Sequence, residues 1–98
     1  IQHRVIHQWR AHTGLINAIV PWKDHVWTAG DDGIKVGNKK TYALITHLRS
    51  HSGRVFSLAK TTSPHTQKAH IWSASWDRSI LVWDAEVRKT FCRCYALI

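Results

Sequence analysis

The chain has 98 residues, of which 44% are hydrophobic; this composition excludes a disordered chain, while the short length limits the size of any core. Fourteen Lys and Arg against six Asp and Glu give a net charge of +8 with neutral histidines, which favours acidic partners, nucleic acid or an anionic membrane surface. The basic residues are scattered, however, and their doublets are limited to Lys39-Lys40 and Arg88-Lys89. Such a distribution is more typical of a solvated surface than of a binding stripe.

Short segments rich in β-branched and aromatic residues follow one another along the chain. We predict strands over 15–20, 25–30, 33–37 and 42–48, and then over 54–60, 70–75, 79–83 and 89–97. Turn residues separate them, among them Gly14, Gly33, Asn38, Gly53 and Pro64. No segment sustains a helical period, so the expected fold class is all-β.

The two halves of the chain repeat each other. Residues 11–20 (AHTGLINAIV) match 50–59 (SHSGRVFSLA), and residues 25–37 (HVWTAGDDGIKVG) match 70–83 (HIWSASWDRSILVW). The second copy carries an insertion within KTTSPHTQKAH, which we interpret as a loop. Two four-stranded units are therefore predicted, over 11–49 and 50–98, and residues 1–10 (with RVIHQWR at 4–10) are expected to be the last strand of a preceding unit.

Repeats of about 40–45 residues with four strands each are typical of β-propeller blades. The second copy resembles a WD-repeat blade: His51 lies in an H-x-G turn, Ser73 in the second strand, Asp77 in the next turn and Trp83, followed by Asp84, in the third strand. The resemblance implies a buried chain of hydrogen bonds. In it, Asp77 accepts from His51, His51 binds the hydroxyl of Ser73, and the indole N–H of Trp83 completes the network.

The first copy matches this pattern in part. It has His12, Thr28 and Asp32 at the corresponding places, but Gly37 stands where tryptophan is expected. It also has one residue fewer between Asp32 and Gly37, which leaves Asp31 as an alternative for the turn position. We expect the network of this unit to be incomplete and the unit to be the softer of the two.

Histidine, aspartate and serine in one network also resemble a catalytic set. The spacing matches the internal network of a blade, in which the serine hydroxyl is buried, whereas nucleophilic catalysis needs an exposed oxygen, a cleft and oxyanion donors. No enzymatic activity is therefore expected of these residues.

Metal and cofactor sites are not predicted. His3 with His7, and His65 with His70, have no second pair at a zinc-ligand spacing, and no G-x-x-x-x-G-K phosphate loop occurs. One residue separates Cys92 from Cys94, so a disulfide between them would be strained, and we expect reduced thiols in an intracellular protein of the cytoplasm or nucleus. No apolar run has the length of a membrane span.

A partner-binding face is expected beside the turn aspartates, where similar blades bind their partners. Trp76 precedes Asp77, and tryptophan and arginine are enriched at binding hot spots. The alternative is that Trp76 packs against a neighbouring blade. The candidate residues of this face are Leu15, Asp31, Arg54, Trp76 and Arg78.

The resemblance implies a non-catalytic scaffold that binds other proteins or peptides. One alternative is a basic surface that binds anionic lipid head groups or nucleic acid through Lys39, Lys40, Arg88 and Lys89. Another is a regulatory or targeting module of a multidomain enzyme. Because propellers close with four to eight blades, two blades would be either an excerpt of a larger propeller or a unit that self-associates into a ring. The start at Ile1, inside a predicted last strand, favours the excerpt.

Overall fold

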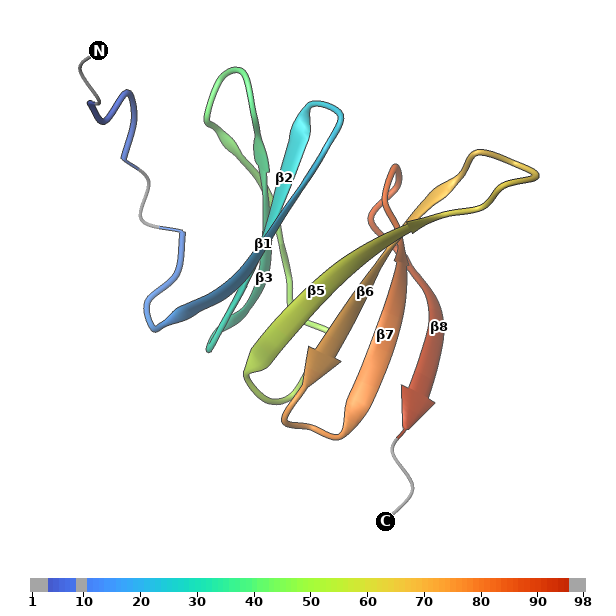
Figure 1. Cartoon of the computed structure of the whole chain (residues 1–98). Helices are drawn as coiled ribbons and strands as arrows, with labels where there is room; N and C mark the ends of the chain where they lie inside the picture. Colours follow the sequence, from blue (N-terminus) through green and yellow to red (C-terminus); the bar gives the residue numbers. More distant parts are fainter. Residues whose placement is uncertain (1–3, 9–10, 96–98) are drawn as a thin grey trace.

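The computed structural model describes residues 4–8 and 11–95, and this part of the chain is all-β, without a helix (Figure 1). Eight antiparallel strands form two four-stranded sheets, and in each sheet the strands are neighbours in chain order. The first sheet contains β1 (Ile16–Trp22), β2 (His25–Gly30), β3 (Gly33–Asn38) and β4 (Leu44–Leu48). The second contains β5 (Val55–Thr62), β6 (Ala69–Ser75), β7 (Ser79–Asp84) and β8 (Thr90–Tyr95).

The strand boundaries differ from the predicted ones where backbone geometry or pairing requires it. β4 begins at Leu44 rather than at Tyr42, because Tyr42 adopts a left-handed φ of 64° in the turn. The insertion of the second copy lengthens the β5–β6 hairpin, so β5 extends to Thr62 and the loop is confined to residues 63–68. That loop is closed by the amide of Ser63, which donates to the carbonyl of Lys68 at 2.9 Å.

The two sheets keep the same strand register despite their different turns. Thr28 on β2 lies opposite Lys35 on β3, and Ser73 on β6 lies opposite Leu81 on β7. Gly37 lies two residues after Lys35 on β3, and Trp83 lies two residues after Leu81 on β7. Gly37 and Trp83 therefore occupy equivalent register positions in the two sheets. The missing residue of the first copy is therefore absorbed by the β2–β3 turn.

The core lies between the two sheets, because β5 packs against β1 and β2 of the first sheet. At its centre the rings of Trp27 and Trp83 meet edge to face, with centroids 6.1 Å apart and both side chains almost fully buried. The middle strands supply the other buried apolar side chains, which include Ile34, Val36, Ile71 and Leu81. This packing fixes the second sheet on the first and brings the β2–β3 turn close to the start of β5, where the candidate site lies (Figure 1).

The predicted strand over residues 4–10 is not formed in the part that the structure describes. Residues 4–8 have no strand conformation and are exposed, and residues 9 and 10 lie outside the described residues. A strand requires a partner strand for its backbone hydrogen bonds, and none of the described strands pairs with residues 4–8. The assignment of residues 1–10 to a preceding blade stays a prediction.

Across residues 4–8 and 11–95, there is no helix of the length and apolarity that a membrane span requires.

Candidate functional site

A chain of hydrogen bonds runs through the second sheet. His51 contacts Asp77 through Nδ1 (3.0 Å) and Ser73 through Nε2 (2.7 Å), and the indole N–H of Trp83 donates to the Ser73 hydroxyl at 2.8 Å. Because a carboxylate accepts, the Nδ1–H of His51 donates to Asp77, which leaves Nε2 to accept from Ser73. The four side chains that the sequence singled out thus form one connected network, and the Ser73 hydroxyl at its centre has no solvent exposure.

Asp77 fixes the β6–β7 turn against the loop that precedes β5. Its carboxylate accepts from the amides of Ser52 and Ser79, each at 2.9 Å, and from the Ser79 hydroxyl. Burial by itself raises the pKa of Asp77, but the hydrogen bonds from Ser79, Ser52 and His51 outweigh it and hold the pKa well below its usual range. The turn is therefore held by an ionised carboxylate.

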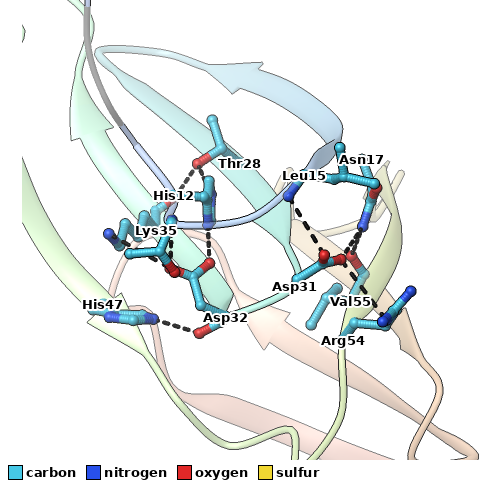
Figure 2. A network of polar contacts seen from close by, with 11 residues as sticks. His12, Leu15, Asn17, Thr28, Asp31, Asp32, Lys35, His47, Arg54 and Val55 are labelled. Atoms are coloured by element: carbon cyan, nitrogen blue, oxygen red, sulfur yellow. Dashed lines mark hydrogen bonds and ion pairs between the residues drawn. The ribbon is translucent and has the colours of Figure 1, made fainter.

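The first sheet has the corresponding histidine network without its indole. His12 binds Asp32 through Nδ1 and the hydroxyl of Thr28 through Nε2, the latter at 2.7 Å (Figure 2). Asp32 rather than Asp31 therefore occupies the turn position. Burial by itself raises the pKa of Asp32, but the hydrogen bonds from His12 and the Thr13 amide outweigh this effect and lower the pKa to about 2.

Other side chains support the first-sheet turn in place of those that are missing. Gly33 occupies the register position of Ser79, so the hydroxyl that binds Asp77 has no equivalent here. Instead, His47 on β4 contacts the carbonyl of Asp32 at 2.8 Å, and Lys35 lies 3.9 Å from the Asp32 carboxylate (Figure 2). The sequence placed His47 only within the predicted strand over 42–48. Comparison of the two repeats does not indicate this contact, because the position on β8 that matches His47 is occupied by Arg93.

The candidate partner face bridges the two sheets. Asp31 accepts from the Leu15 amide at 3.4 Å and lies 3.8 Å from the guanidinium of Arg54 (Figure 2). The Arg54 guanidinium in turn stacks over the Trp76 ring at 4.9 Å from its centroid. Trp76 is 68% exposed and Arg54 is half-exposed. Arg78 lies in the same turn with a left-handed φ of 71°. Four of the five predicted face residues are thus joined in one chain of contacts.

Asn17 is a member of this face that the sequence did not indicate. Its amide nitrogen donates to the carbonyl of Val55 at 2.9 Å and to the Asp31 carboxylate at 3.4 Å (Figure 2). It therefore joins β1 to β5 beside the ion pair between Asp31 and Arg54. A polar residue in the first strand of a unit has no distinctive spacing, so the pattern of the sequence could not reveal this bridge.

The remaining candidate ligands form no cluster in the described part of the chain. Among the side chains that the structure describes, in residues 4–8 and 11–90, there is no group of three or more His, Cys, Asp or Glu that could hold a metal ion. His3 and the side chains of Cys92 and Cys94 lie outside what the structure describes. The buried hydroxyl of Ser73 is out of reach of a substrate, so the Asp-His-Ser arrangement has the geometry of a structural network.

The chain was compared with known proteins at three levels. No protein-family model matches the sequence, and neither a curated protein nor a solved structure matches it.

Proposed function

We propose that this protein is a non-catalytic, intracellular scaffold of the WD-repeat type, in which the two sheets are two propeller blades and the face around Trp76 binds other proteins. Three features support the blade assignment. Each repeat builds one four-stranded antiparallel sheet in chain order, the histidine, hydroxyl and aspartate positions of the motif are bonded in both sheets, and the tryptophan joins them in the second.

The observation that carries the proposed function is the stacked pair of Arg54 and Trp76. A tryptophan exposed over two thirds of its surface is costly to leave in water and contributes strongly when a partner covers it. Its ring is held in place by the Arg54 guanidinium, and Arg54 is itself oriented by Asp31 of the other sheet. A partner would therefore meet a largely pre-formed surface and would pay little side-chain entropy to bind it.

The turn that carries Trp76 is held by several hydrogen bonds, which supports the second requirement of a binding face, a fixed conformation. Asp77 bonds to the preceding loop, and the Ser75 hydroxyl donates to the carbonyl of Arg54 at 2.9 Å. These bonds hold Arg54, just before β5, next to Trp76, just after β6. The buried network of each blade then serves as the support of its surface.

The proposal is tested by affinity capture from cell extract with the 98-residue chain and its Trp76→Ala and Arg54→Ala variants. Both variants are expected to lose the same bound proteins at least tenfold, because hot-spot residues commonly contribute more than about 1.4 kcal/mol. Trp72→Ala is the matched control, since Trp72 is also partly exposed on the second sheet but lies away from the turn.

The charge-based alternatives give a different outcome. If the basic surface bound nucleic acid or anionic lipid, capture would fall steeply between 50 and 200 mM salt, as is typical of binding to phosphates. It would then depend on Lys39 and Lys40 and would be insensitive to Trp76→Ala. That result would contradict the proposed scaffold face.

A further inference from the structure

The first sheet contains a cavity of about 160 Å³ at the position where it lacks a tryptophan. Thr28 and Gly37 contribute to its lining, and both are buried, so they lie at its inner end. The other described lining residues are His7, Ile19, Val26, Asn38, Lys39 and Tyr42. Its walls are almost entirely apolar.

The second sheet indicates what such a cavity accommodates. There, Trp83 occupies the register position of Gly37, and its indole N–H donates to Ser73, which occupies the register position of Thr28. The first sheet thus retains the hydroxyl that would accept an indole N–H but has no side chain to supply one. The cavity is the size of a small aromatic molecule, since an engineered protein cavity of about 150 Å³ binds benzene.

The hydroxyl of Thr28 has lone pairs available for such a bond, although it also lies 3.4 Å from the carbonyl of Lys35. The Nδ1–H of His12 donates to Asp32, so the Nε2 atom of His12 accepts from Thr28. A hydroxyl that donates its hydrogen in this way keeps lone pairs for an incoming N–H. The same arrangement of His51 and Ser73 in the second sheet receives the N–H of Trp83.

The outer end of the cavity carries two aromatic rings. His7 and Tyr42 stack nearly parallel, with their centroids 4.5 Å apart and an interplanar angle of 9°. Both residues line the cavity, so a flat ligand would enter beside flat surfaces. The shape of the opening and the polarity of the inner end therefore favour the same class of ligand.

We propose that the cavity of the first sheet is a binding site for a small planar aromatic molecule with one ring N–H, of the indole class. The ligand takes the place of the missing tryptophan side chain: its ring fills the apolar walls, and its N–H donates to Thr28. This site shares no residue with the face around Trp76.

The test is a titration of the ¹⁵N-labelled 98-residue chain with free indole, in which binding is monitored through the NMR chemical shifts of the backbone amides. We expect saturable shifts centred on the amides of Thr28 and Gly37, with a dissociation constant of about 0.1–1 mM, as befits a ligand of this size. Benzofuran, which has the same shape without the N–H, is expected to bind roughly fivefold to tenfold more weakly because it leaves the hydroxyl without a donor.

Gly37→Trp is the decisive variant, because it places an indole in the cavity covalently. We expect it to abolish indole binding and to raise the melting temperature. Should this variant fail to fold, Gly37→Leu fills the same space with a smaller group and is expected to weaken binding at least tenfold. Undiminished indole binding in a folded cavity-filled variant, shifts located away from Thr28 and Gly37, or the absence of saturable shifts would each overturn the site. Equal affinity for benzofuran would overturn the assigned bond to Thr28.

Discussion

The two sheets of this protein share one network design but complete it differently. In the second sheet, Trp83 and Ser79 satisfy the inner and outer ends of the network, whereas glycines occupy both positions in the first. The histidine and aspartate nevertheless form the same contact in both sheets. The contact between histidine and aspartate, which clamps the turn, therefore forms whether or not a tryptophan side chain fills the inner end of the network.

The largest expected effect comes from converting the second sheet to the state of the first. Trp83→Gly removes a buried indole and leaves a void, which costs about 3–5 kcal/mol, and glycine in a strand adds to this loss. We expect the melting temperature, followed by circular dichroism, to fall by at least about 15 °C. Trp72→Ala is the control, because Trp72 is 41% exposed; a comparable loss in both variants would contradict the central role of Trp83.

The next effect distinguishes the two clamps. Asp77→Ala removes the acceptor of a histidine, two amides and a hydroxyl, and its side chain is only 7% exposed, so we expect a loss of about 2–4 kcal/mol. Asp32→Ala leaves His47 and its carbonyl contact in place, and its side chain is 21% exposed, so about 1–2 kcal/mol is expected. Urea denaturation measures both values. If the stability of Asp77→Ala is unchanged, or if Asp32→Ala loses more stability than Asp77→Ala, then the clamp of the second sheet is not the stronger of the two.

Acid should weaken both clamps in the same direction. The folded state lowers the pKa of Asp32 from 3.8 to about 2, and it also lowers the pKa of Asp77. Their contribution is therefore present above the unfolded-state pKa of 3.8 and is lost as the pH falls through the folded-state pKa, with about 2 kcal/mol lost by about pH 2 for Asp32. Urea denaturation between pH 6 and pH 2.5 should show this loss, and Asp32→Asn should reduce it. An unaltered pH dependence in that variant would assign the loss to other carboxylates.

The smallest effect is expected at the bridge between the sheets. The ion pair of Asp31 and Arg54 is 3.8 Å long and partly exposed, so its coupling energy should be at most about 0.5 kcal/mol. A double-mutant cycle with Asp31→Ala and Arg54→Ala measures it. A coupling above about 1.5 kcal/mol would mean that these residues stabilise the fold as well as orienting Trp76.

The fold was predictable from the sequence to the extent that it depends on local pattern. Alternating apolar residues and turn residues predicted all eight strands, and the resemblance to a WD-repeat blade implied the histidine, hydroxyl and aspartate contacts that both sheets form. Strand formation in residues 4–8 could not be judged in this way, because pairing depends on a neighbour rather than on composition.

The contacts that cross between strands were the least predictable part of the site. His47 reaches Asp32 from the last strand of its sheet, Asn17 reaches Val55 of the other sheet, and Ser79 reaches Asp77 within a turn. None of these residues has a spacing that distinguishes it from other polar residues. The cavity at Gly37 was equally hidden: the sequence indicated a missing tryptophan, but only the packing around the gap decides whether neighbouring side chains close it.

The position of the length differences between the two repeats has a consequence for how such a chain can evolve. A deletion within a strand would move every following side chain to the opposite face of the sheet. Here, the lost residue falls in the β2–β3 turn and the inserted residues fall at the tip of the β5–β6 hairpin, so the inward-facing positions of both copies stay aligned. The hairpin tips are thus the sites where codons can be gained or lost at little cost, and the loops of each repeat can change in length while the strand register is kept.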